Sequence, residues 1–541
     1  MCIRDRLKSV TSCDAGLLFA VYMYVLDCRY RRTAMTRCAG FFAVAAVFTL
    51  FFAQFASFAE DDLCEDLRNF QARQGKPQRW SGGESFPPLP LPATPLRRSE
   101  KKRQPSPPTL VGKVAYGEII EMKDADGRVR RVRDWITDPN DVHNLMKEVN
   151  RRLTIHYKAQ EVSLDNFSFD PAEIPILYLA GCKEVALDKG SRERLRWYLQ
   201  AGGVLLCDPV CGSEAFLKGW MNEMNHIFPK RKIRELPPDH PIYNCFYKID
   251  KVNYEIDGKA LSGPPKLLGI DIGCRTVVVL SPFDMSLAWG GHYYPRGRHI
   301  WPAEDAFKLG VNLVAYFLAT YKQGRHNALE VVYHEEDKPD ADALAVGQVI
   351  HAGDWDPHPN AVANLLKFAA ANSTLNVRFK REAVDLAASD LSRFPVLFMT
   401  GHYDPELGDL EISRLRTYLG QGGVLFADAC CGSERFDRAF RGMVEKMYPG
   451  KLEPIAPASS LYNISGAPVG RFALKPILAQ EVSADEVRIL GVGNNGVYSV
   501  IYSPYAIGCG LEGEDAPFSR GFEKDTSLLL GLNVLVYALT H

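Results

Sequence analysis

The residue types best suited to chemistry occur in one short segment, which runs from Cys207 to Cys211 and includes Asp208. The segment follows an apolar run that is typical of a buried strand. A cysteine on a tight turn from a strand into a helix can act as a nucleophile, because the helix N-terminus lowers the pKa of its thiol. His240 or His292 could serve Cys211 as a base. One hypothesis is therefore a cysteine- or aspartate-dependent hydrolase or amidotransferase-like enzyme, with Cys211, Asp208 and His240 as catalytic candidates.

The polar residues near this segment also have a structural interpretation. Asp208 stands at a strand end, where it could bind a ligand hydroxyl, hold a cation, or cap the following helix together with Ser213, and we favour the cap. Asp134 and Trp135 could form a polar and aromatic rim for a sugar or peptide, but a helix start with a core tryptophan is the favoured interpretation. The ligand-binding candidates are Asp134, Trp135, Asp208, Ser213, Glu214, Asp284, Asp428, Ser433 and Glu434.

Metal ligation has no signature in the spacing of cysteines. The chain contains no Cys-x-x-Cys, and the two-plus-two spacing of a zinc site is missing. Spacing alone also brings no group of Asp, Glu or His together. We therefore expect neither a metal site nor a cofactor. Nine cysteines lie beyond residue 59, and an odd number in an exported protein leaves at least one thiol unpaired.

A tandem duplication supplies the elements that position these residues. A shift of 220 residues superimposes long stretches of the chain without a gap. The register then slips slightly, so that Ser281-Pro282 matches Ser503-Pro504. The clearest pairs are Asp134-Trp135 with Asp354-Trp355, Pro175 to Gly181 with Pro395 to Gly401, Gly202-Gly203 with Gly422-Gly423, and Cys211-Gly-Ser-Glu214 with Cys431-Gly-Ser-Glu434. The sequence therefore predicts two repeats, at about 111–325 and 326–541.

Each repeat alternates buried strands with amphipathic helices. The strand-helix-strand unit around the Gly-Gly pair predicts a parallel sheet with right-handed crossovers. The expected fold is doubly wound α/β, in which ligands bind beyond the carboxyl ends of the strands. That rule places the loops after Gly181, Asp208 and Pro282 at one rim of the first repeat.

The histidines test whether both repeats share a catalytic mechanism. None of the twelve recurs at the duplicated position; His240 faces Ser460, for example, and His402 faces Cys182. A cysteine-histidine mechanism common to both repeats is therefore excluded. We favour a non-catalytic binding or interaction module, and the alternative is an enzyme with its site in the first repeat only.

The sequence blocks shared by the two copies resemble a bacterial family of unknown function. The run from Tyr198 through Gly-Gly to Asp208, followed by Cys211-Gly-Ser and Ser281-Pro-Phe-Asp284, resembles domain of unknown function 4159. That resemblance implies a flavodoxin-like fold related to class I glutamine amidotransferases, and it implies no established activity. The Gly-x-Cys-x-Gly motif of true amidotransferases is absent. The second copy replaces Asp284 by Ala506, which makes the first copy the better candidate for an active site.

The N-terminal residues predict export. The chain of 541 residues begins with MCIRDR, which resembles a translated sequencing-adaptor artefact, and we interpret 1–34 as artefact or untranslated sequence. Residues 35–59 predict a signal peptide, with a membrane anchor as the alternative, and 60–110 predict a disordered Pro-rich linker. We expect a periplasmic or extracellular protein without a membrane span after cleavage.

The charge balance and the duplication limit the kinds of partner that we expect. Lys plus Arg number 64 against 65 Asp plus Glu, which gives no basic footprint for nucleic acid. The expected partner is a small molecule, a glycan or a protein. We also expect the two repeats to pack on each other.

Overall fold

The computed structural model describes residues 106–541, except for 118, 124–126, 137, 257–258, 292–298, 329–342, 467, 495 and 514–515. The predicted artefact, the signal peptide and all but the end of the predicted linker lie outside the described residues, as does His292. The first strand begins at Thr109, inside the segment predicted as linker. Residues 106–541 form one compact unit that contains both repeats.

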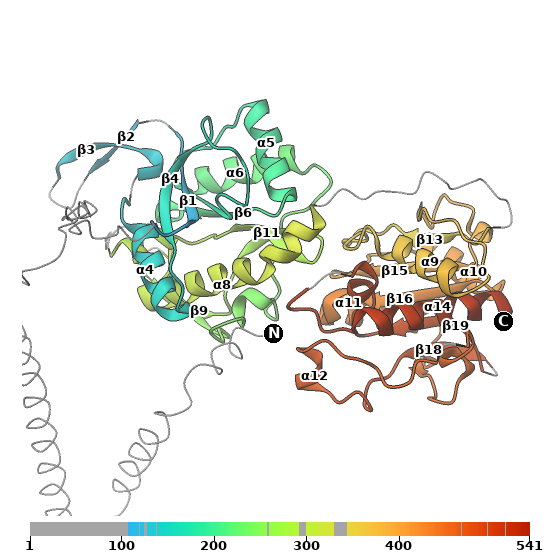
Figure 1. The fold of residues 1–541 in the computed structure, drawn as a ribbon. Coiled ribbons are helices and arrows are strands. Elements are labelled where there is room, and N and C mark those ends of the chain that lie inside the picture. The colour runs from blue at the N-terminus through green and yellow to red at the C-terminus, as the bar shows by residue number, and fades with distance from the viewer. Residues whose placement is uncertain are drawn as a thin grey trace, which may run out of the picture. The chain divides into compact units, whose positions relative to one another are not determined.

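The first repeat is built on a seven-stranded sheet, shown in blue to green in Figure 1. Its order is β4-β1-β5-β6-β11-β10-β7, and β4, β1, β5, β6 and β11 run parallel. The strand bounds are β1 Thr109–Ala115, β4 Lys158–Ser163, β5 Ile176–Gly181, β6 Val204–Pro209, β7 Arg234–Glu235, β10 Leu268–Ile272 and β11 Arg275–Leu280. The predicted strand before Gly181 and the predicted strand after the Gly-Gly pair are thus confirmed as β5 and β6.

Side-chain alternation explains why the central strands are buried on both faces. In β5, Ile176 and Tyr178 belong to one hydrophobic cluster, and Leu177 and Leu179 belong to another. Because successive side chains of a strand point to opposite faces, the sheet needs an apolar layer on each side. One layer contains α4 (Asp141–Leu153) and α8 (Ala303–Asn327), and the other contains α5 (Lys189–Gln200) and α6 (Glu214–Ile227).

The second repeat has the same architecture, shown in yellow to red in Figure 1. Its sheet order is β14-β13-β15-β16-β19-β18-β17, with β14, β13, β15, β16 and β19 parallel. The strand bounds are β13 Val346–Val349, β14 Glu382–Val384, β15 Val396–Gly401, β16 Val424–Ala429, β17 Glu453–Pro454, β18 Leu490–Asn494 and β19 Val497–Ser503. The covering helices are α9 Ala361–Asn372, α10 Asp409–Gly420, α11 Glu434–Met447 and α14 Lys524–Thr540. The duplication and its strand-helix alternation are therefore confirmed.

Both sheets depart from the all-parallel expectation at one edge. In the first repeat, β10 and β11 form an antiparallel hairpin, and β7 pairs with β10. The matching hairpin in the second repeat is β18 with β19. The turn between β10 and β11 contains Gly273, with φ +63°, and Cys274, so this unpredicted hairpin decides where Cys274 lies.

The first repeat also carries additions that the second lacks among the described residues. They are the hairpin β2 (Ile119–Lys123) with β3 (Val129–Arg133), and a small sheet of β8 (Val252–Ile256), β9 (Lys259–Gly263) and β12 (His299–Ile300). No helix in the described part of the chain has both the length and the apolarity needed to cross a bilayer.

Candidate functional site

The strand-end carboxylates that both repeats share stabilise the fold by accepting hydrogen bonds from the backbone. The Asp208 carboxylate accepts hydrogen bonds from the backbone N–H groups of Met285 and Ser286, at 3.0 and 2.8 Å, and from the Tyr178 hydroxyl at 3.0 Å. It therefore stabilises the start of α7 (Ser286–Gly290), which lies beyond β11, and not the helix that follows β6. Asp428 has the same role at α13 (Gly508–Glu512).

Asp284 lies next to Asp208 in the first repeat. It is fully buried and accepts hydrogen bonds from the N–H of Cys211, the N–H of Leu287 and the Ser286 hydroxyl. Burial raises the pKa of Asp284 to about 6. Burial, with the nearby Asp284 charge, raises the pKa of Asp208 well above its usual range. Two carboxylates in one dry site thus favour protonation of at least one of them.

Asp134 and Trp135 are inside the first repeat. Trp135 is 5% exposed and Asp134 is fully buried. The Asp134 carboxylate accepts hydrogen bonds from the N–H groups of Cys182 (2.8 Å) and Lys183 (3.1 Å), which fixes the loop after β5. The favoured structural interpretation of this pair agrees with its geometry, and a rim for a sugar has no support from it.

Ser213 and Ser433 cap α6 and α11. Each hydroxyl accepts the N–H of the residue three positions on, and each also donates to a backbone carbonyl, of Cys182 at 2.6 Å and of His402 at 2.7 Å. The predicted cap by Ser213 is therefore present. Glu214 pairs with Lys218 on the surface, whereas Glu434 lies 3.8 Å from Arg520 beside a pocket.

Cys211 and His240 are not brought together. Burial and the Asp284 charge raise the pKa of Cys211 to about 12. The His240 ring hydrogen bonds to the Thr276 hydroxyl at 3.0 Å, and burial lowers its pKa to about 4. Cys207 is fully buried in β6, and burial raises its pKa as well. Among the described residues, these positions leave Cys207 and Cys211 without an imidazole partner from His240.

Four other thiols converge from distant parts of the chain. Cys430 and Cys431 follow β16, Cys509 lies in α13, and Cys274 comes from the β10–β11 turn of the first repeat. Their four Sγ atoms all lie within 4.8 Å of one another. Cys431 has a left-handed backbone (φ 53°), as does its counterpart Cys211 (φ 56°), so the turn itself belongs to both repeats. The four-thiol cluster, by contrast, occurs once among the described residues.

Two histidines flank the thiols. The Nε2 atom of His358 lies 3.2 Å from the Sγ of Cys430 and 3.3 Å from the Sγ of Cys274. His402 hydrogen bonds through Nδ1 to Asp354. Burial lowers the pKa of His402, but the charge of Asp354 and the neighbouring Cys431 outweigh it and raise that pKa well above the usual range. Hydrogen bonds from Cys274 and Cys430 lower the pKa of Cys431 to about 7.

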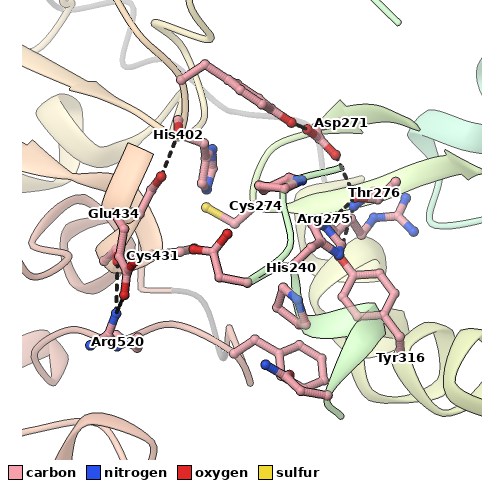
Figure 2. A pocket seen from close by; sticks show the side chains of 18 of the residues that line it. His240, Asp271, Cys274, Arg275, Thr276, Tyr316, His402, Cys431, Glu434 and Arg520 are labelled. Carbon is pink, nitrogen blue, oxygen red and sulfur yellow. Dashed lines mark hydrogen bonds and ion pairs between the residues drawn. The ribbon is translucent and has the colours of Figure 1, made fainter. Parts of the chain in front are cut away.

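A cavity of about 330 Å³ opens beside the thiols. Figure 2 shows His240, Arg275 and Tyr316 from the first repeat facing His402, Cys431 and Arg520 from the second. Arg275 is held by the carbonyls of Leu199 and Gly202, and Arg520 by Glu481 at 2.7 Å. Both guanidinium groups are thus held in place by groups of the protein, and Arg520 is paired with a carboxylate.

A second cavity, of about 370 Å³, is basic on one side. Its first-repeat wall carries Lys230, Arg231, Lys232 and Arg234, and its second-repeat wall is the loop from His351 to Pro357. Of its three carboxylates, Asp354 binds His402, Asp356 binds Arg381, and Asp271 accepts from Tyr403 and Thr276. In the described part of the chain, none of the four cations on the first-repeat wall forms an ion pair.

Tyr403 lines both cavities and joins the repeats. Its hydroxyl donates to the carboxylate of Asp271 at 2.6 Å, and the Arg234 guanidinium stacks 4.1 Å from its ring centroid. Burial and the Asp271 charge raise the pKa of Tyr403, so the hydroxyl keeps its proton. Tyr316 stacks on Phe518 at 5.3 Å. The repeats therefore contact each other through specific side chains.

Sequence reasoning missed both the thiol cluster and the basic cavity. Three of the thiols were visible as Cys430-Cys431 and Cys509 in one repeat, but the fourth thiol comes from a hairpin 156 residues away from Cys430. A spacing rule that examines one segment at a time finds no such site. The cations of 230–234 were visible as a short basic run, whose partner surface lies in the other repeat.

Comparison with known proteins adds a family and no activity. A search of curated proteins finds no match. The model of the family described as domain of unknown function (DUF4159) matches residues 126–318 and again residues 345–539. These two matches cover most of the chain; the second spans every strand of its sheet, whereas the first begins after β1. The protein therefore belongs to the DUF4159 family and contains two tandem copies of its domain.

Proposed function

We propose that the two repeats form a non-catalytic binding module, which holds a small anionic solute in the basic cavity. The observation that carries this proposal is the wall of Lys230, Arg231, Lys232 and Arg234 facing the loop from His351 to Pro357. A solute in this position would contact both repeats at once. The duplication then has a purpose that one copy could not serve.

The charge of the cavity favours an anion. Of the carboxylates that line it, Asp354 is paired with His402 and Asp356 with Arg381. Asp271, which accepts from the hydroxyls of Thr276 and Tyr403, is left to balance four cations, so the net charge of the wall is positive. Arg231 and Arg234 instead donate to backbone carbonyls, which carry no net charge. A volume of about 370 Å³ lies near the low end of ordinary small-molecule pockets and suits a compact carboxylate or phosphate.

The positions of Cys211 and His240 in the first repeat support a non-catalytic role. Cys211 has a thiol pKa of about 12, and its N–H is already bound to Asp284. His240 is directed to Thr276. A thiol nucleophile needs a lowered pKa or an adjacent base, and Cys211 has neither in the described residues.

A thiol-dependent hydrolase in the second repeat is the second candidate. The observation that favours it is that His402 is held by Asp354 and interacts with Cys431, an order of acid, histidine and cysteine suited to nucleophilic catalysis. In the first repeat Cys182 replaces His402, so only one copy could act. Turnover of p-nitrophenyl acetate that His402→Gln and Cys431→Ser both abolish would establish this candidate.

Export and the finer architecture are also part of the proposal. The basic and apolar composition of residues 35–59 supports a signal peptide, and with it a periplasmic or extracellular location. The order of the five parallel strands, second-first-third-fourth and then the last, supports a flavodoxin-like fold related to amidotransferase domains.

Isothermal titration calorimetry tests the anion site. We expect citrate or inorganic phosphate to bind, and glucose not to bind. The double variant Lys230→Glu and Lys232→Glu should weaken anion binding by about tenfold or more, because two attractive charges become repulsive. Lys446→Glu, at an exposed position of α11, is the matched control and should leave binding unchanged. Failure of both anions to bind, or equal weakening by the control, would refute the proposal.

A further inference from the structure

We propose that Cys274, Cys430, Cys431 and Cys509 bind one Zn²⁺ ion as a tetrathiolate site that joins the two repeats. This site is separate from the basic cavity and goes beyond the proposed anion binding. No sequence motif announces it. The inference rests on the positions of four sulfur atoms and of the groups around them.

The sulfur separations match one tetrahedral ion. The Sγ of Cys274 lies 3.2 Å from that of Cys430 and 3.9 Å from that of Cys509. The Sγ of Cys431 lies 3.6 Å from that of Cys509 and 4.0 Å from that of Cys430. A zinc–sulfur bond of about 2.3 Å in a tetrahedron places the sulfurs about 3.8 Å apart. The four thiols therefore already have the spacing of a zinc shell.

Other sulfur chemistry fits these separations less well. A disulfide needs sulfurs about 2.05 Å apart, and even the closest pair is 3.2 Å apart. An iron–sulfur cluster spreads its thiolates over several irons, which holds the sulfurs farther apart than four atoms within 4.8 Å of one another. A mononuclear ion is the species that four such close sulfurs can surround. Among soft-ligand ions, Zn²⁺ is the usual occupant of a closed Cys₄ site.

The surroundings are those of a structural metal site. Cys430 and Cys509 are fully buried, and Cys274 and Cys431 are half-buried. The Nε2 of His358 lies within hydrogen-bond distance of two of the sulfurs, where an N–H would stabilise thiolate charge. Binding converts thiols to thiolates, so the protons displaced by the ion leave to solvent. The fold already supplies four ligands, which leaves no open position for a catalytic water.

The stoichiometry follows from the difference between the repeats. At the positions that match Cys430 and Cys509, the first repeat has Val210 and Leu287. Only Cys211, the match of Cys431, is a thiol there. Within the described residues there is therefore one such site, for one ion, and this ion links the β10–β11 hairpin of the first repeat to the second.

Metal content and cobalt spectroscopy of the purified full chain test the inference. We expect one zinc per chain by elemental analysis. Replacement of zinc by CoCl₂ should give the intense visible absorption of a tetrahedral cobalt thiolate. Cys431→Ser and Cys274→Ser should each weaken zinc binding by about tenfold or more, because loss of even an outer partner has an effect of about that size.

Cys211→Ser is the matched control, because Cys211 has the same turn in the other repeat. It should retain one zinc and the cobalt spectrum. Four thiols that stay metal-free after incubation with ZnCl₂, a mass that reveals disulfides between them, or iron in place of zinc would each overturn the inference. Circular dichroism of Cys274→Ser separates loss of the site from loss of the fold, because Cys274 lies in a turn.

Discussion

In the first repeat, Val210 follows strand β6 and Leu287 lies in α7, which follows the neighbouring strand β11. In the second repeat the matching positions, after β16 and in α13, hold Cys430 and Cys509. The frame around these pairs is the same, since Asp208 and Asp428 accept backbone N–H groups of α7 and α13 in the same way. The shared carboxylates are therefore the residues that the fold requires. The positions that differ do not take part in these hydrogen bonds, and at these positions the second repeat has cysteines.

The two copies also diverge in how they hold charge. The first has two adjacent buried carboxylates, Asp208 and Asp284, whereas the second has Ala506 in place of Asp284. The second has His402 bound to Asp354, whereas the first has Cys182 at that position. The second copy is therefore the one in which imidazole groups lie beside thiols, since His358 contacts Cys430 and His402 interacts with Cys431.

Zinc removal should produce the largest difference between the repeats. If the thiols hold an ion, a free zinc concentration of 100 to 1,000 times the dissociation constant stabilises the fold by about 3–4 kcal/mol. We therefore expect a strong chelator to lower the melting temperature of the protein, and added zinc to restore it. Cys211→Ser should show the same dependence on zinc, and Cys509→Ser should lose it. Scanning calorimetry with and without chelator measures both effects. A melting temperature that does not depend on zinc would show that the four thiols hold no stabilising ion.

The second-largest effect should be a pH dependence of the free energy of unfolding that arises from Asp284 in the first repeat. Asp284 has a pKa of about 6 in the fold against an ordinary 3.8, so its protonated form stabilises the fold. That contribution is complete below about pH 3.8 and is lost as the pH rises to about 6. Relative to Asp284→Ala, which installs the residue of the second repeat, the protein should lose about 2–3 kcal/mol between about pH 4 and pH 6.

Urea denaturation of both proteins across that range gives the difference directly. The variant also loses the hydrogen bonds of Asp284, which shifts its stability at every pH, so the slope and not the offset is the test. If the difference in free energy of unfolding between the two proteins does not change with pH, the pKa of Asp284 is not raised in the folded state.

Removal of the Tyr403 hydroxyl tests the contact between the repeats. Tyr403→Phe loses the 2.6 Å hydrogen bond to the Asp271 carboxylate but keeps the aromatic ring under Arg234. Hydrogen bonds to charged groups contribute about 1.5–3 kcal/mol when buried, and Asp271 is half-buried, so we expect a loss of about 1–2 kcal/mol. Lys183→Met changes the matching position of the first repeat and is the control. Unaltered melting of the Tyr403 variant would argue against this contact.

The helix caps should show the smallest effects, and equal ones. Ser213→Ala and Ser433→Ala each remove a cap from the helix after the turn, with an expected loss of about 1 kcal/mol. Because the geometry is the same in both copies, the two losses should agree within about 0.5 kcal/mol. Chemical denaturation of the single variants measures them. If only one of the two substitutions lowers the free energy of unfolding, the two capping serines do not contribute equally, although their hydrogen bonds are the same.

Local pattern was enough to predict the frame of the fold. The duplication, the strand that ends at Gly181 and the role of Ser213 all follow from short stretches of sequence, because strand burial and capping are local properties. The antiparallel hairpin β10–β11 was not predicted, since its strands are short and resemble the parallel ones. The partner of Asp208 was also misjudged, because the N–H groups it accepts come from the loop after another strand.

The candidate site was harder to predict because its parts are far apart in the chain. Cys274 meets Cys509 across 235 residues, and the basic run at 230–234 meets a loop beyond residue 350. The sequence favoured the first repeat, since Asp284 and His240 are replaced by Ala506 and Ser460 in the second. The three-dimensional arrangement instead gathers the thiols around the second.

X-ray absorption at the zinc edge tests the central claim most directly, because it counts the atoms bound to the ion in the intact chain. The account predicts four sulfur neighbours at about 2.3 Å and no nitrogen or oxygen in the first shell. Cys431→Ser should reduce the sulfur count to three, and Cys211→Ser should leave it at four. A shell made of nitrogen and oxygen, or a sulfur count that falls with Cys211→Ser, would contradict the assignment of the site to the second repeat and the hairpin that reaches it.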